Sequence, residues 1–217
     1  MHTELLGFDI RLRAEDYVEA RWDQNSRAIY LLRPEIKWPL SVDQMVWPSF
    51  FRYSKDRGPG YLEHEEVIDV TPSNTRHSAL ELWPSLEEMK TCFTQQPAKH
   101  QKKGIEIAVM LLADEPSLSR EYWRAVLDPA FSPNEPPKGW EFLGYDIADE
   151  YMLSGLTNCG YSEDKKSSLK QKWSNRLNEF GLLATLEDAS EFKKITDQRV
   201  TEHSPFFIYS LFSAPTR

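Results

Sequence analysis

The densest group of side chains that could do chemistry is the acidic stretch Glu63-His64-Glu65-Glu66, followed closely by Asp69. Carboxylate oxygens and an imidazole nitrogen are suitable ligands for a divalent cation. Neighbouring residues of an extended chain point in opposite directions, so the stretch would need ligands from elsewhere to enclose an ion. We therefore expect a solvated acidic loop rather than a metal site. An acidic surface that docks a basic partner is the functional alternative.

A second carboxylate group, Asp146, Asp149 and Glu150, follows a predicted strand. At a spacing of i and i+4, Asp146 and Glu150 would share one side of a helix, and such a pair can act in acid–base catalysis. Nothing nearby in the sequence supplies a nucleophile or an orienting base. We therefore expect Asp146 to cap a helix that follows it. If the chain is an enzyme, Asp146, Glu150 and His203 are the best candidate site.

Motifs for other common chemistries are missing from the sequence. Its nine glycines form neither GxGxxG nor GxxxxGK[ST], which excludes nucleotide binding through those loops. GxSxG and HExxH are also absent, and no two of the five histidines lie four residues apart. Cys92 and Cys159 are isolated, so no CxxC zinc or redox site is indicated. We predict a protein that is not an enzyme and uses no metal or cofactor.

Composition narrows the possible partners and the compartment. The chain has 34 acidic and 26 basic side chains, for a formal charge of −8, which argues against direct binding of a nucleic-acid backbone. Hydrophobic residues make up 40% and the chain has seven Trp, as expected of a folded globular protein. No apolar run approaches the roughly 18 residues of a membrane span. With two cysteines and no signal peptide, the cytoplasm is the expected compartment.

Apolar patterning predicts strands at residues 4–13, 28–32, 105–112, 140–147 and 206–212. It predicts helices from Ser85, which begins a capping box, to about Thr94, and at 116–127, 148–156, 163–180 and 186–197. Gly181 is expected in the left-handed conformation that ends a helix. Strands and helices do not alternate strictly, so we predict an α+β fold. We expect one mixed or antiparallel sheet with helices mainly on one side, in a single domain over 1–217 with a possible subdivision near 129–138.

Two distant segments, Leu5–Ile10 and Phe142–Ile147, are identical at four of six positions. The 137 residues between Gly7 and Gly144 are too long for a solenoid period. We interpret the pair as two strands of one sheet, each needing a small Gly and an Asp where the strand ends.

The C-terminal part of the chain resembles bacterial immunity proteins of contact-dependent inhibition and related polymorphic toxin systems. The resemblance rests on the segments Gly139–Ile147 and Leu153–Tyr161, continued by Trp173, Leu177-Asn178 and Gly181-Leu182. It implies a cytosolic protein that binds and blocks one cognate toxin domain, often a nuclease. It assigns no binding residue to any position of this chain.

The leading hypothesis is a non-enzymatic immunity protein that holds its toxin through an acidic and aromatic surface. That surface could include Glu63, Glu65, Glu66 and Asp69. An enzyme of unrecognised family with a carboxylate and histidine site is one alternative. A structural or regulatory homodimer is the other.

Overall fold

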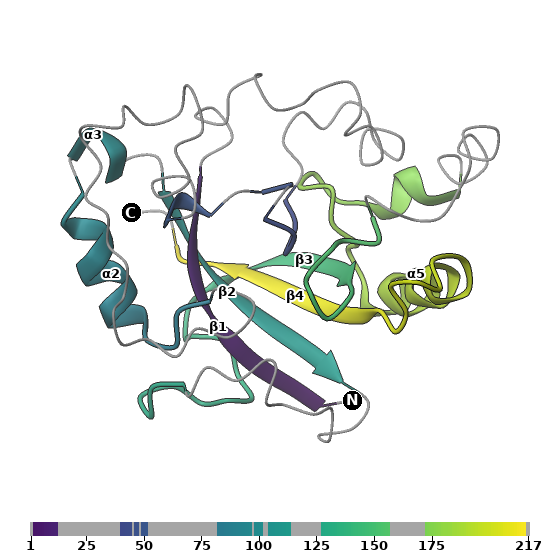
Figure 1. Cartoon of the computed structure of the whole chain (residues 1–217), viewed down its shortest axis with the longest axis horizontal. Helices are drawn as coiled ribbons and strands as arrows, with labels where there is room; N and C mark the ends of the chain where they lie inside the picture. Colours follow the sequence, from purple (N-terminus) through teal and green to yellow (C-terminus); the bar gives the residue numbers. More distant parts are fainter. Residues whose placement is uncertain are drawn as a thin grey trace.

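The computed structural model describes residues 2–12, 40–44, 46–47, 49–51, 82–96, 98–101, 104–113, 127–156 and 172–215. Their centre is a four-stranded antiparallel sheet with the strand order β1-β2-β4-β3 (Figure 1). The strands are β1 (His2–Leu12), β2 (Gly104–Ala113), β3 (Glu141–Ala148) and β4 (Phe207–Ser213). The helices are α2 (Leu86–Thr94), α3 (Ala98–Gln101) and α5 (Leu186–Arg199), with a 3-10 turn η5 (Ser174–Arg176). The predicted α+β class is confirmed, and β2 and β4 are the two central strands.

The two longer helices pack against the same face of the sheet. Met89 of α2 lies in one buried cluster with Met110 of β2, and Phe192 of α5 lies in another with Ile208 of β4. Met110 is paired with Ser210, two residues from Ile208, so these strand residues point to one side. The predicted one-sided packing therefore holds for α2 and α5, which lie at opposite ends of the sheet (Figure 1).

Each of these helices begins at a hydroxyl cap. Ser85 Oγ accepts the Glu88 N–H at 3.2 Å, as the capping-box pattern predicts, and Thr185 Oγ1 accepts the Asp188 N–H at 3.1 Å. In α5, Ala189 and Phe192 are fully buried against the sheet. Capping thus fixes where both helices start.

The opposite face of the sheet is covered by the strap, which we define as the described residues of 40–51. Its Val42 and Trp47 pack in one buried cluster with Val109, Tyr209 and Leu211 from the two central strands. The strap lies over the sheet between its two edge strands (Figure 1). The strap thus covers the face of the sheet opposite to the face on which α2 and α5 pack.

The sheet has an internal two-fold relation. A bulge at Gly7 in β1 lies opposite Val109, and a bulge at Gly144 in β3 lies opposite Leu211. Val109 and Leu211 are themselves a pair between β2 and β4. A two-fold rotation about that pair exchanges β1 with β3 and β2 with β4. The interpretation of the sequence repeat as two strands of one sheet is confirmed, and the two strands are the two edges of that sheet.

The two-fold relation extends to the segments that lead into the helices. Phe8 exchanges two backbone hydrogen bonds with Trp83, at 2.8 and 2.9 Å, shortly before α2. Tyr145 exchanges two with Leu183, both at 2.9 Å, shortly before α5. Each half of the sheet is thus a strand, a helix and a second strand, joined in the same way.

Between residues 172 and 181 the predicted helix 163–180 differs from the structure, and 163–171 lie outside the described residues. The chain becomes extended at Leu177, after η5. Asn178 accounts for this, because its Oδ1 accepts the Phe180 and Leu182 N–H groups and its Nδ2 donates to the Leu143 carbonyl at 2.6 Å. An Asn side chain that bonds to nearby backbone competes with helix formation. Gly181 adopts the expected left-handed conformation, with φ of 77°.

The predicted strand 28–32, and the predicted helix 116–127 apart from Leu127, lie outside the described residues. The connection at 129–138 is described. It packs against the sheet, with the ring of Phe131 4.7 Å from that of Phe8.

The bulge glycines allow a prediction about stability. Gly144 has φ of 143°, and a Cβ there would lie 2.6 Å from Leu182 Cβ. We expect Gly144→Ala to lower the free energy of unfolding by about 2–4 kcal/mol, because it adds a clash to backbone strain. Gly139 also has a positive φ, 83°, but a Cβ there meets nothing within 4 Å. Gly139→Ala should cost only about 1 kcal/mol. Urea unfolding followed by Trp fluorescence measures both, and equal losses would contradict the packing argument.

Candidate functional site

The four acidic residues predicted to bind a partner, Glu63, Glu65, Glu66 and Asp69, lie outside the described residues. Their role stays a prediction. The second predicted group, Asp146, Asp149, Glu150 and His203, is described in full, and the structure separates it into two parts.

Asp146 is completely buried on the strap side of β3 and is bound by four donors. Its carboxylate accepts the Ser41 hydroxyl at 2.5 Å, the Ser154 hydroxyl at 2.6 Å, the Val42 N–H at 3.0 Å and the Ile147 N–H at 2.7 Å. The expectation that Asp146 caps a following helix is wrong. Its carboxylate instead ties the edge strand to the strap.

Burial and hydrogen bonding act on Asp146 in opposite directions. Desolvation raises the pKa of its carboxyl, while the hydrogen bonds from Ser154, Ser41, Val42 and Ile147 lower it, and the balance is a pKa of about 6. Burial is therefore the larger effect. The group still carries its charge at neutral pH.

The two-fold relation supplies an internal comparison for this carboxylate, since it matches Asp146 to Asp9. Asp9 is also fully buried, and its Oδ1 accepts the Ser49 hydroxyl and the Ile10 N–H, both at 2.8 Å. It also has a countercharge, because Arg11 Nε lies 2.9 Å from Asp9 Oδ2. The residue that corresponds to Arg11 in the second half is Ala148, which carries no charge.

The segment after Asp146 is the display turn, which we define as residues 149–154. A helix was predicted here, and the structure contradicts it. Asp149 holds the segment in a turn instead of a helix. Its Oδ1 accepts the N–H groups of Tyr151 at 2.8 Å and Leu153 at 2.9 Å. Its Oδ2 lies 2.8 Å from His203 Nδ1, and its carbonyl accepts the Tyr209 hydroxyl at 3.0 Å. One buried residue therefore organises the whole turn.

Two residues of the predicted enzyme site have different hydrogen-bond partners. His203 contacts Asp149, whereas Asp146 is enclosed by the strap and by Ser154. Asp149 was predicted as part of the second carboxylate group but not as part of the enzyme site, because its separation of 54 residues from His203 in the sequence gave no signal of their contact.

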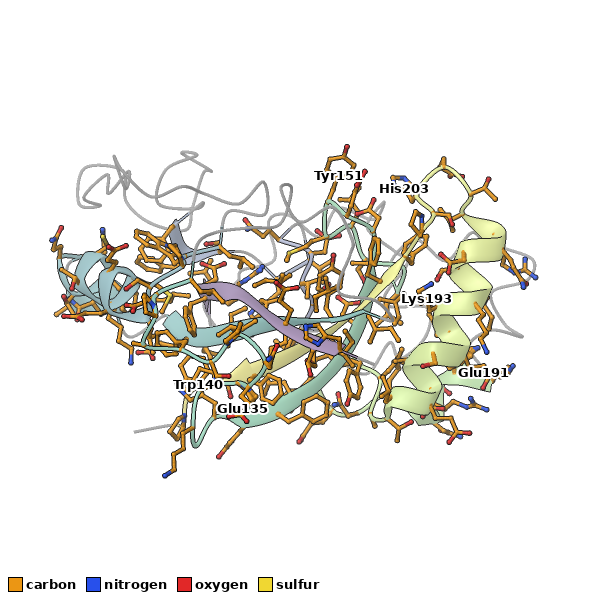
Figure 2. All side chains as sticks on the ribbon, turned by 90° about the horizontal axis from the view of Figure 1, so that it is seen from below. Glu135, Trp140, Tyr151, Glu191, Lys193 and His203 are labelled. Atoms are coloured by element: carbon orange, nitrogen blue, oxygen red, sulfur yellow. The ribbon has the colours of Figure 1, made fainter. Side chains whose placement is uncertain are left out.

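The display turn holds two large apolar side chains in solvent. Tyr151 is 57% exposed and Leu153 36%, while Met152 between them is buried at a left-handed φ of 60°. Tyr151 and His203 lie at the same edge of the molecule (Figure 2). Glu150 and Glu202 are both exposed, each next in sequence to one member of the Asp149–His203 pair. The described residues thus contain an acidic and aromatic surface.

Comparison with known proteins finds no family model, curated protein or solved structure that matches this chain. In the part of the chain that the structure describes, no three His, Cys, Asp or Glu side chains are placed to hold a metal ion. No helix among those residues is long and apolar enough to cross a membrane.

The buried carboxylate predicts a specific pH dependence. Because its pKa is raised in the folded state, the contribution of Asp146 to stability is full below pH 3.8 and is lost as the pH rises through about 6. We expect the free energy of unfolding of the wild type, minus that of Asp146→Asn, to fall by about 3 kcal/mol between pH 3.5 and 7.

Urea unfolding at each pH measures this difference, and the subtraction removes the titration of other groups. Glu150→Gln, which removes an exposed carboxyl from the display turn, is the matched control for the loss of a charge and should leave the free energy of unfolding at pH 7 near that of the wild type. A constant difference between wild type and Asp146→Asn would contradict the raised pKa.

Proposed function

We propose that this chain is a non-enzymatic immunity protein that binds and blocks a cognate bacterial toxin domain, with the display turn as a main contact. The observation that carries the proposal is the pair of exposed side chains, Tyr151 and Leu153, on a turn fixed from within by Asp149. An exposed apolar pair on a rigid support is typical of a protein-binding surface.

Rigidity of the turn supports this function. Ordering a loop at an interface costs free energy, so a loop that is already ordered binds more tightly with the same contacts. Asp149 contacts Tyr151, Leu153, His203 and Tyr209 through its own atoms. The turn is further tied to the strap, because the Ser154 N–H donates to Asp43 Oδ2 at 3.2 Å. Tyr151 and Leu153 are therefore presented in one arrangement before a partner arrives.

Charge indicates the kind of partner. The chain carries a formal charge of −8, and Glu150 and Glu202 are exposed beside the Asp149–His203 pair. A nuclease must attract phosphate, so its substrate-binding surface is basic. An acidic surface with an aromatic anchor is suited to such a domain, and opposite charges speed the encounter.

One observation favours an enzyme as a second candidate. Asp149 is buried and contacts His203 Nδ1, while the imidazole is about one-third exposed. A carboxylate on Nδ1 orients a histidine whose Nε2 acts as a general base. The hydroxyl of Ser154, which is also in the display turn, donates to Asp146.

The anchor role of Tyr151 is testable with the protein encoded beside this gene. Co-expression of the wild type should relieve growth arrest caused by that protein, and Tyr151→Ser should lose this protection. In calorimetry of the purified pair we expect Tyr151→Ser to weaken binding by about tenfold to a hundredfold, as for an interface anchor.

Phe142→Ser is the matched control, because Phe142 is also an exposed aromatic but lies outside the display turn. It should leave toxin binding unchanged. If wild-type protein fails to bind the neighbouring gene product at low salt, the immunity function is wrong. If Tyr151→Ser binds like the wild type, only the contact is misplaced.

The charge argument gives a separate kinetic prediction. The association rate should fall about tenfold or more from low to high salt. Glu150→Lys and Glu202→Lys, each measured as a single variant, should also lower the association rate at low salt. Glu187→Lys, at an exposed position in the first turn of α5, changes the net charge at another place and should have a smaller effect. Stopped-flow fluorescence measures the rates. Equal effects from all three positions would show that only net charge matters.

A further inference from the structure

Three aromatic side chains form a continuous strip on the helix side of the sheet. The ring of Phe142 lies 4.8 Å from that of Tyr145 and 5.4 Å from that of Phe212. We call these three residues the aromatic strip. Phe142 is 43% exposed, and the other two rings are partly exposed. Residues on this surface thus remain in contact with solvent although they belong to two paired strands.

The two-fold relation allows the exposure of this strip to be compared with that of the corresponding residues in the other half of the sheet. It matches Phe142 to Leu5, Tyr145 to Phe8 and Phe212 to Met110. Leu5 is only 2% exposed, and Phe8 and Met110 are also buried. The three positions are therefore buried in the half that contains β1, and the corresponding positions are at least partly exposed in the half that contains β3.

The cover over the first half comes from residues 127–140. The ring of Phe131 lies 4.7 Å from that of Phe8, and the ring of Trp140 lies 6.0 Å from it. The carbonyl of Pro133 accepts the Leu5 N–H at 2.6 Å, so the segment also binds the edge of β1. Burying the exposed part of a ring such as Phe142 removes apolar surface from water, which is favourable. Covering the aromatic strip is therefore favourable in free energy.

Charges around the strip indicate what covers it. Phe212 packs against the same buried cluster as Phe131 and Trp140, so the strip adjoins the segment 127–140. In this segment and at the start of β3, Glu135, Lys138 and Glu141 are exposed. A patch that carries both signs of charge can pair with itself under a two-fold rotation, acid to base. A uniformly basic partner would meet Lys138, and a nucleic acid would meet both glutamates.

We propose that the aromatic strip is covered in solution by the same strip of a second copy of this chain, in a two-fold symmetric dimer. Each copy then provides for the other what residues 127–140 provide for Leu5 and Phe8. The surface is distinct from the display turn, since Tyr151 lies at the opposite edge of the molecule from Trp140 and Glu135 (Figure 2). Dimerisation and toxin binding can therefore occur together.

Light scattering on the full chain, over about a hundredfold range of concentration, tests the dimer. The wild type should show the mass of two chains at the upper concentrations. Phe142→Asp should show the mass of one chain, with the dimer dissociation constant raised by about a hundredfold or more, because it buries a charge in the contact. Tyr151→Asp is the matched control, since it places the same charge on an exposed aromatic of the display turn, and it should remain a dimer. Circular dichroism confirms that both variants are folded.

A charge exchange at exposed positions tests the pairing without touching the rings. Lys138→Glu should weaken the dimer by making the patch wholly acidic, and adding Glu141→Lys should restore it. A wild-type mass of one chain at the highest concentration overturns the proposal and leaves the strip for a partner of another sequence. A dimer that Phe142→Asp leaves intact also overturns it, because the contact must then lie elsewhere. Neither result bears on toxin binding, which is measured with Tyr151→Ser.

Discussion

Two aspartates buried on one face of the sheet impose the constraint on which the rest of the structure depends. A carboxylate removed from water is tolerated only if its oxygens are hydrogen-bonded. Ser41 bonds to Asp146 at one edge of the sheet and Ser49 bonds to Asp9 at the other. Both serines belong to the strap, so the strap must run from one edge strand to the other. It is held there by polar contacts as well as by the packing of Trp47.

The two halves of the sheet share one plan and differ where function is proposed. Each half has a bulged edge strand with a buried Asp, a hydroxyl-capped helix and a central strand. Packing requires these features in both, because Gly7 and Gly144 each admit a neighbouring backbone where a Cβ would clash. Packing of the sheet does not require the features that are present in only one half. These features are the display turn after β3 and the exposed aromatic strip.

Local chemistry made some elements predictable. The capping box at Ser85 located the start of α2, and the β-branched apolar run located β2, because each signal lies within a few residues of the structure it specifies. The Gly and Asp of the repeat indicated two strands of one sheet. The two-fold axis that relates these two strands was not predictable. It depends on the pairing of Val109 with Leu211, which are 102 residues apart in the sequence.

The display turn could not be read from the sequence for the same reason. Residues 148–156 have a composition compatible with a helix, and the decisive contacts come from Asp43, His203 and Tyr209, all distant in the chain. Asp146 illustrates the limit, since an Asp at the end of a strand is usually read as a cap. Its actual partners are Ser41, 105 residues away, and Ser154.

Arg11 and Ala148 occupy corresponding places in the two halves but give the two buried aspartates different surroundings. In the first half the guanidinium of Arg11 lies against Asp9 and donates to the carbonyls of Val42 and Trp47. In the second half Ala148 pairs with Ser154, whose hydroxyl donates to Asp146, just as Arg11 pairs with Ser49, whose hydroxyl donates to Asp9. The two halves differ in where this serine comes from. Ser49 belongs to the strap, whereas Ser154 ends a turn that leaves β3 and returns to pair with it, and this return leaves Tyr151 and Leu153 facing solvent.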